Sequence, residues 1–362
     1  TLTIDGKYYC WLEYFIKRVA DEQKKTGIRL LDVLDIHWYP SESSNSDLLQ
    51  LHRVFFDETY VYPGANGVKT VNGGWDTSQN KEYIFKRIND WLLLHFGENH
   101  GITLALTEND ISSSNPNIVS VVYASMLGTF ADNGVEIFTP WSWKTGMWET
   151  LHLFSRYTKG TRVKTTSDND ATVSGYSTVN SNNDSMTVIL VNRDLSASRT
   201  ATVNLTGFAV ANGSYKVLEL SSLPATETFV SHTTNALKSK NVSVSGNSFS
   251  ITLPALSTTA VILKGALVGI DDNQQDSGDS ESFSAYPNPT SGKFRIHFAG
   301  EISGQITLRF SDLAGNTVLT INAENNSEID LSETGLASGL YFITTEHKGH
   351  IWRTKLVYSR SK

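Results

Sequence analysis

The stretch Ile102-Thr-Leu-Ala-Leu-Thr-Glu108 decides the fold class of this 362-residue chain. Its mostly apolar residues follow a glycine and end on a carboxylate, which is typical of a parallel strand buried on both faces. Helical patterns flank it at 81–96 and 118–133, and a glycine directly follows each of them. A strand between two helices indicates a parallel α/β arrangement.

The same alternation extends on both sides of this stretch. A helical pattern at 12–25 precedes an apolar run at 29–37, and another strand is predicted at 135–139. This makes about three strand–helix units, whereas a complete (β/α)8 barrel has eight in about 250 residues. We therefore predict that residues 1–160 form the second half of a barrel, and that the chain is truncated on its N-terminal side.

From about residue 161 the chain becomes rich in Thr, Ser, Val and Asn, with short alternating runs between turn residues. These runs lie at 185–192, 200–205, 214–220, 249–253 and 259–263. They predict a β-sandwich over 161–266. The acidic, polar segment 267–282 is a predicted solvated linker. Five further runs predict a small C-terminal β-sandwich over 283–362; they lie at 293–298, 305–310, 317–321, 339–346 and 350–357.

Composition excludes several classes of function. The net charge is −7 and there is no basic stripe, so nucleic acid is not an expected partner. The single cysteine, Cys10, allows neither an intrachain disulfide nor a cysteine-based metal site, and no His-x-x-x-His pair supports zinc. No apolar run is long enough for a transmembrane segment. Nucleotide-binding glycine motifs and a Gly-x-Ser-x-Gly elbow are missing, so we expect no cofactor and no metal.

Glu108 is the first candidate for chemistry, although a surface glutamate after a strand is an open alternative. His37 and Trp38 end an earlier predicted strand, and Trp141 follows a later one. The carboxyl ends of parallel strands meet on one face of a barrel, so these side chains should converge. Aromatic rings stack on the apolar faces of sugars. A carboxylate, a histidine and several tryptophans together indicate a sugar site, although glycoside hydrolysis normally needs two carboxylates.

Other residues have plainer interpretations. Trp75 lies in a glycine-rich loop, where a packing role is more common than a ligand platform. Trp91 falls on the apolar face of a predicted helix and is expected in the core. Asp32 and Asp35 flank one strand at odd spacing, so their side chains point opposite ways. A structural, hydrogen-bonded role is favoured for both.

Three segments carry a resemblance to a known family. The first is Thr26-Gly-Ile-Arg-Leu-Leu-Asp-Val-Leu-Asp-Ile-His-Trp-Tyr-Pro40, the second is Leu106-Thr-Glu-Asn109, and the third is Val135–Trp143. These segments resemble glycoside hydrolase family 44, the endoglucanase and xyloglucanase family. The resemblance covers roughly residues 1–265 and implies a (β/α)8 barrel followed by a β-sandwich. It implies a retaining double displacement with Glu108 as the nucleophile. The family usually has Thr-Glu-Tyr-Asn, so this chain departs where Asn109 stands.

The resemblance also implies a substrate cleft. His37, Trp38, Tyr39, Trp75 and Trp141 would line it and bind a β-glucan such as cellulose or xyloglucan. The family's acid/base glutamate follows an asparagine on the fourth strand, and no Asn-Glu-Pro-like segment occurs here. The acid/base is therefore expected upstream, and this chain alone is expected to be inactive. The alternative is a non-catalytic cell-surface glycan-binding protein on a degenerate hydrolase scaffold.

The C-terminal unit carries a second, independent resemblance. Its motifs are Ala285-Tyr-Pro-Asn-Pro-Thr-Ser-Gly292, Leu313-Ala-Gly315, Leu336-Ala-Ser-Gly-Leu-Tyr-Phe342 and Lys355-Leu-Val357. In this order and spacing they resemble the C-terminal sorting domain of the Bacteroidetes type IX secretion system. This implies the secretion machinery as a partner, and a protein that is secreted or attached to the cell surface. We expect the protein to be a monomer. A small carbohydrate-binding sandwich is the alternative, but Trp352 alone is too few for an aromatic platform.

Overall fold

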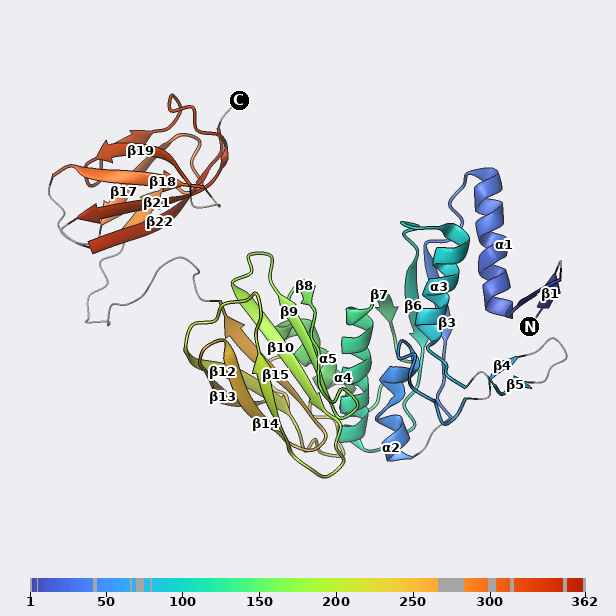
Figure 1. Cartoon of the computed structure of the whole chain (residues 1–362). Coiled ribbons are helices and arrows are strands. Elements are labelled where there is room, and N and C mark those ends of the chain that lie inside the picture. Colours follow the sequence, from blue (N-terminus) through green and yellow to red (C-terminus); the bar gives the residue numbers. More distant parts are fainter. Residues whose placement is uncertain are drawn as a thin grey trace. The chain divides into compact units, whose positions relative to one another are not determined.

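The computed structural model describes most of the chain, namely residues 2–4, 6–41, 44–65, 67–69, 75–78, 80–265, 283–298, 304–312, 316–347 and 350–360. The chain divides into two compact units, Thr1–Ile270 and Asp271–Lys362 (Figure 1). The predicted linker at 267–282 lies outside the described residues.

The N-terminal part of the first unit contains a parallel sheet of three strands in the order β3-β6-β7. These are β3 (Val33–His37), β6 (Thr103–Glu108) and β7 (Val135–Phe138). The stretch Ile102–Glu108 thus contains the central strand, as predicted. The predicted strand at 29–37 is shorter in the structure, because its first residues precede the pairing that begins at Val33.

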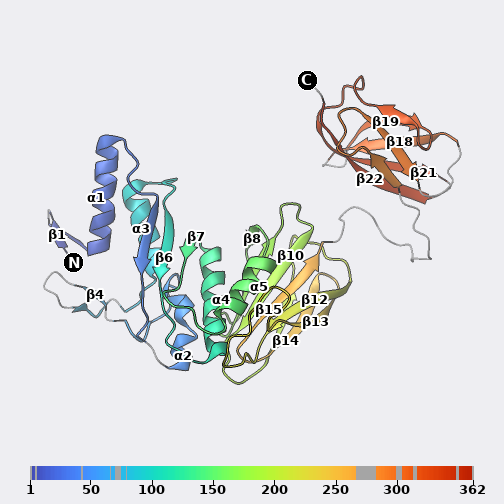
Figure 2. The ribbon, with the colours of Figure 1, turned by 180° about the vertical axis from the view of Figure 1, so that it is seen from behind.

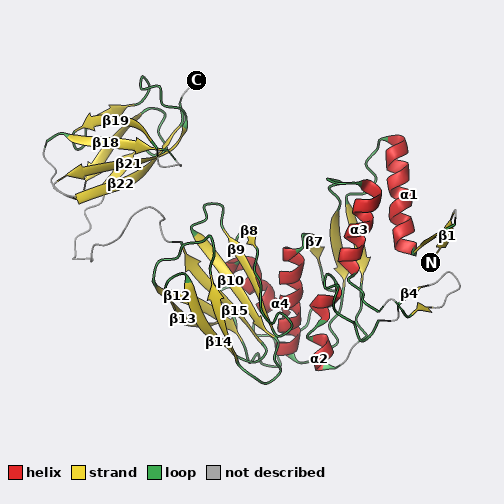
Figure 3. Ribbon diagram, viewed as in Figure 1, coloured by secondary structure: helices red, strands yellow, loops and turns green. Residues whose placement is uncertain are grey.

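Helices alternate with these strands, as the glycine stops predicted (Figure 3). They are α1 (Trp11–Thr26), α3 (Ile84–Phe96), α4 (Pro116–Asp132) and α5 (Met147–Tyr157), with a short α2 (Asn45–Leu48) and a 3-10 helix η1 (Leu51–Val54). Two small hairpins complete this part, β1 (Leu2–Ile4) with β2 (Lys7–Tyr9), and β4 (Val68–Lys69) with β5 (Trp75–Asp76). The helix α5 was not predicted from the sequence.

The β-sandwich follows, with a six-stranded sheet in the order β13-β12-β15-β10-β9-β8 and a two-stranded sheet β11-β14. Its strands are β8 (Thr161–Val163), β9 (Val173–Val179), β10 (Ser185–Asn192), β11 (Arg199–Asn204), β12 (Gly213–Leu220), β13 (Lys238–Val244), β14 (Ser248–Leu253) and β15 (Ser257–Lys264). All strand pairs in both sheets are antiparallel.

One hydrophobic core runs from the parallel sheet into the sandwich. Leu104 and Leu106 of β6 belong to the same buried cluster as Ile189 and Val191 of β10. Helices α4 and α5 lie between the two sheets (Figure 1). Strand β10 is therefore buried on both faces. One face packs on the helices, and the other, which carries Val188, packs on the interior of the sandwich. The two parts of this unit therefore fold against each other.

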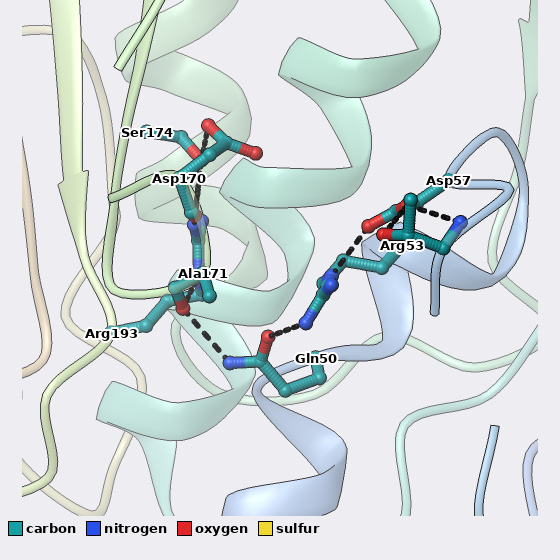
Figure 4. A network of polar contacts seen from close by, with 8 residues as sticks. Gln50, Arg53, Asp57, Asp170, Ala171, Ser174 and Arg193 are labelled. Atoms are coloured by element: carbon teal, nitrogen blue, oxygen red, sulfur yellow. Dashed lines mark hydrogen bonds and ion pairs between the residues drawn. The ribbon is translucent and has the colours of Figure 1, made fainter. Parts of the chain in front are cut away.

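A buried arginine fastens the junction (Figure 4). Arg193, which follows β10, donates from Nη1 to Ser125 Oγ of α4 at 2.9 Å and from Nε to the Ala171 carbonyl at 3.3 Å. The same carbonyl accepts a hydrogen bond from Gln50 Nε2 at 2.9 Å. Gln50 in turn accepts from Arg53 of η1 at 3.3 Å. The sandwich loop is thereby tied to both α4 and the segment after β3.

The second unit is a small sandwich, seen from behind in Figure 2. Its sheets have the orders β16-β17-β20 and β19-β18-β21-β22. The strands are β16 (Phe283–Tyr286), β17 (Lys293–Phe298), β18 (Ile306–Ser311), β19 (Thr317–Ala323), β20 (Glu328–Asp330), β21 (Gly339–His347) and β22 (His350–Tyr358). Phe294, Phe298 and Phe310 lie in its core. The predicted motif Leu313–Gly315 lies outside the described residues.

None of the helices in the part of the chain that the structure describes has both the length and the apolar character that crossing a membrane requires.

Candidate active site

A register irregularity between β3 and β6 sets the direction of Glu108. Ile36 pairs with Leu106, but His37 pairs with Glu108, so β6 holds one extra residue at this point. Regular alternation would put Glu108 on the same face as Leu106, which is buried against the helices. A bulge re-aims the side chain that follows it. Glu108 accordingly leaves the core, and its side chain is 28% exposed.

Two side chains, one at the end of β3 and one just after it, approach one oxygen of Glu108. The Tyr39 hydroxyl donates to Oε2 at 2.7 Å, and His37 Nδ1 lies 3.2 Å from the same atom. Oε1 has no hydrogen-bond partner among the residues that the structure describes. Desolvation, the hydrogen bond to Glu108 and the charges of Glu108 and Asp110 raise the pKa of Tyr39 to about 12. Tyr39 is therefore a neutral hydroxyl donor around pH 7.

Asn109, the residue at which the chain departs from the motif of the family that it resembles, joins the ends of the three strands. Its side chain is buried and donates from Nδ2 to the Trp38 carbonyl at 2.9 Å. Its own carbonyl accepts the Trp141 backbone N–H at 2.8 Å. The Trp38 N–H donates to the Glu108 carbonyl at 3.0 Å. These bonds hold the loops after β3 and β7 against the Glu108 strand end.

A second carboxylate, Asp110, is already engaged. Its Oδ1 accepts from the Ile111 N–H at 2.9 Å and from Ser142 Oγ at 3.0 Å, and Lys144 Nζ lies 3.0 Å away. Asp110 thus joins the loop after β6 to the loop after β7.

The predicted aromatic residues differ in their surroundings. Trp38 is half-buried, with ring centroids 5.2 Å from Phe55 and 5.6 Å from Tyr62, so it supports the wall of the site. Trp141 is 66% exposed directly after β7, beside the Glu108 strand end. Trp75 is 49% exposed on the β4–β5 hairpin, a separate element of the loop between β3 and α3.

The structural interpretation of the two aspartates holds. Asp35 accepts hydrogen bonds from the Thr107 N–H at 3.1 Å and from Thr107 Oγ1 at 2.5 Å, which links β3 to β6. Asp32 pairs with Arg29. Trp91 is partly buried against the core, as predicted. No group of three or more His, Cys, Asp or Glu side chains within the described residues is arranged to hold a metal ion.

Sequence reasoning missed the residues that order this site. Asn109, Asp110 and Ser142 all follow strand ends by one to four residues. Position after a parallel strand was the available signal, because this is where side chains converge. It was applied to Glu108 and Trp141 but not to their polar neighbours.

Comparison with known proteins adds to this geometry. Residues 5–42 match glycoside hydrolase family 44. Residues 117–257 match the alpha-L-arabinofuranosidase C-terminal domain, and residues 284–359 match the secretion system C-terminal sorting domain. The resemblances to family 44 and to the sorting domain are thereby confirmed. The sorting-domain match indicates export by the type IX secretion system, as predicted.

Curated relatives are endoglucanases. Endoglucanase A of Paenibacillus lautus is 21% identical over 382 residues, which cover 96% of this chain and 50% of the relative. Beta-mannanase/endoglucanase A of Caldicellulosiruptor saccharolyticus is 23% identical over 231 residues, or 56% of this chain and 17% of the relative. The chain thus spans half the length or less of these relatives.

Solved structures show the same fold. A family 44 xyloglucanase from Paenibacillus polymyxa has a TM-score of 0.60 at 20% identity, covering 73% of this chain and 52% of that chain. A bifunctional glucanase-xylanase from a metagenome library has a TM-score of 0.57 at 24% identity, covering 72% and 48%. The first unit therefore has the architecture of part of a barrel glycosidase together with extensive β-structure.

Proposed function

We propose that this chain is the C-terminal part of a secreted, retaining endo-β-1,4-glucanase acting on cellulose or xyloglucan. Residues 1–160 are part of its (β/α)8 barrel, 161–266 its sandwich and 283–362 its sorting domain. The observation that carries the proposal is the setting of Glu108. One of its oxygens is held by Tyr39, while the other, at the end of a central parallel strand, has no hydrogen-bond partner in the described parts of the chain.

Glu108 is the nucleophile in this proposal, acting through Oε1. The Oε1–anomeric carbon bond forms as the bond from that carbon to the leaving oxygen breaks, and a second carboxylic acid protonates the leaving oxygen. Water then attacks the glycosyl-enzyme, giving its proton to the second carboxylate and releasing Glu108. Tyr39 keeps its proton throughout, since its pKa is about 12, and orients the carboxylate by its bond to Oε2.

The stacking surface of the site is assigned to aromatic rings. Trp141 is the most open of the three predicted platforms, and Trp75 and the supported ring of Trp38 extend the surface. His37 and Tyr39 bind both Glu108 and the sugar that it attacks. Two observations support this assignment. The curated relatives are endoglucanases, and the indole rings of Trp75 and Trp141 are exposed.

The acid/base is assigned to a segment outside this chain. Asp110, the carboxylate nearest to Glu108 in sequence, is paired with Lys144. Strand β3 pairs only with β6 in the described residues, and large apolar side chains of α1, α3 and the adjoining segment are exposed. These are Trp11, Phe15, Ile28, Leu30, Leu93 and Leu94. Further strand–helix units beside β3 would cover this apolar surface and bring the second glutamate opposite Glu108.

The test uses the parent protein with its complete barrel. Glu108→Gln should abolish hydrolysis of xyloglucan and cellulose while leaving glucan affinity in place, because only the nucleophilic charge is lost. Glu98→Gln, which alters an exposed glutamate after α3, is the matched control and should keep full activity. Near-normal turnover by Glu108→Gln would sink the assignment.

Two further outcomes are decisive. The 362-residue chain alone should hydrolyse nothing, and measurable endoglucanase activity would show that the acid/base lies within it. If the parent protein binds glucan without hydrolysing it, the alternative of a cell-surface glycan-binding protein is correct. We further propose that the exported protein is a monomer whose sorting domain is removed or attached to the cell surface.

A further inference from the structure

A second pocket lies next to the Glu108 site, and the mechanism above does not use it. Its volume is about 610 Å³, within the range of ligand pockets. It is formed by the loop after β6 and the loop after β7, with the α4 residue Val119 as its buried floor. The lining residues are Ser112, Ser113, Ser114, Val119, Trp143, Lys144 and Thr145.

One wall of the pocket is a fixed aromatic ring. Trp143 stacks on Trp148 with the ring centroids 4.1 Å apart and the planes at 11°. The edge of Tyr123 lies against the same indole, with centroids 6.0 Å apart. Trp143 nevertheless remains 41% exposed. Its partners hold the orientation of the ring, so a ligand that stacks on its open surface loses little ordering entropy to the indole.

Other lining residues supply hydroxyl groups. Ser112 and Ser114 are exposed, and Thr145 is partly exposed. Within the described parts of the chain, the hydroxyls of these three residues make no hydrogen bond to protein. Ser113 differs, since its Oγ accepts the Asn115 N–H at 3.2 Å. The pocket therefore offers both hydrogen-bond donors and acceptors together with an aromatic face, a combination that matches the surface of a pyranose ring.

The charge of the pocket favours a neutral ligand. Lys144 is the cation on its lining, but Nζ lies 3.0 Å from Asp110 Oδ1 and donates to the Ile111 carbonyl. Its charge is thus largely compensated by Asp110. The pocket therefore has little net positive charge to attract a phosphate or a uronate. Binding of an uncharged polyol does not depend on such charge.

The position of the pocket connects it to the cleavage site. Ser112 follows Glu108 by four residues, a span of at most about 14 Å. Trp143 follows Trp141 by two residues on the other wall. A glucan chain stacked on Trp141 beside Glu108 can therefore continue into the pocket without leaving the surface.

We propose that this pocket is a distal subsite that binds one glucosyl residue of the β-1,4-glucan chain, stacked on Trp143 and hydrogen-bonded by the serine wall. The subsite rests on the proposed function, and it makes affinity depend on chain length. Oligosaccharides long enough to span from Glu108 to the pocket bind more tightly than short ones.

The experiment measures binding of cellotriose and cellohexaose to the parent protein with its complete barrel by calorimetry, in a Glu108→Gln background that prevents turnover. Ser114→Leu fills the pocket from an exposed loop position. Trp143→Ala removes its aromatic wall. Each should weaken cellohexaose about five- to tenfold and leave cellotriose unchanged.

The matched control is Ser196→Leu, at an exposed sandwich loop. It should bind cellohexaose within about twofold of the unmodified pocket, a difference of about 0.4 kcal/mol. Unchanged cellohexaose binding by Ser114→Leu and Trp143→Ala, with folded circular dichroism spectra, overturns the subsite alone. If the unmodified pocket binds neither oligosaccharide, the proposed function of this chain fails with it.

Discussion

Gly128 permits the close contact between α4 and strand β9 of the sandwich. A Cβ atom at this position would lie 2.4 Å from three atoms of the Tyr176 ring in β9. That ring is buried, and its hydroxyl donates to the Ser125 carbonyl at 3.2 Å and lies 3.2 Å from Thr129 Oγ1. Gly128→Ala should therefore destabilise the first unit, although alanine is the better helix former.

The magnitude follows from three contributions. Alanine in place of glycine in a helix interior is favourable by about 1 kcal/mol. The Tyr176 ring must move about 1 Å to reach an ordinary carbon contact, which costs about 1–3 kcal/mol as overpacking. This movement also weakens the two hydrogen bonds of the hydroxyl, at about 1 kcal/mol each. A net loss of about 2–4 kcal/mol remains, equivalent to a fall in Tm of about 4–16 °C for a unit of this size.

Thermal unfolding of the full chain, followed by far-ultraviolet circular dichroism, measures this loss. Gly160→Ala is the matched control, because a Cβ there meets nothing within 4 Å. Tyr176→Leu in the Gly128→Ala background should recover part of the lost stability by making room for the methyl group. A Gly128→Ala chain as stable as the Gly160→Ala control would refute the contact between α4 and β9.

Three further predictions concern the site, the pH dependence and export. Tyr39→Phe should lower kcat of the parent enzyme about tenfold with little change in KM, since it removes one charge-assisted hydrogen bond of about 1.5 kcal/mol from Glu108; steady-state kinetics with an unchanged kcat would contradict this. Burial raises the pKa of Asp132 to about 6, so the stability that its proton supplies is present at low pH and lost as pH rises through about 4 to 6. Asp132→Asn should thus gain up to about 2 kcal/mol over the wild type near pH 7 but little near pH 4, as measured by urea unfolding. Deletion of 283–362 should abolish export from a host with a type IX system while leaving glucan binding intact; secretion of the truncated chain, detected in the culture medium, would argue against a sorting role.

Local signals account for the elements that were predicted well. Helix α1 begins after Cys10, whose Sγ accepts the Glu13 N–H, and ends at Gly27 with φ of 69°. Strand β17 alternates between exposed and buried residues along its whole length, because one of its faces lies on the core of the second unit. Such caps and periods are properties of a few adjacent residues, so they can be recognised without knowledge of the fold.

Helix α5 shows where this approach fails. Glu149 and His152 interrupt its apolar stripe, yet both are buried. Glu149 Oε1 accepts from Thr228 Oγ1 at 2.8 Å and from the Ala236 N–H at 2.9 Å, both from the sandwich. Its partners are about eighty residues distant in the chain. A polar residue within a helical pattern is predicted to lie on the surface unless the element that supplies its hydrogen-bond partners is known.

Glu108 combines both cases. Its residue type and its place at the end of a buried parallel strand were determined by the sequence alone, since they depend on an apolar run and its boundary. Its direction was decided by the tertiary structure, because the extra residue in β6 exists only through pairing with β3, about seventy residues earlier. That pairing turns the carboxylate out of the core and toward Tyr39 and His37. Register between distant strands is a property of the folded sheet, and it positions the carboxylate that we propose as the nucleophile.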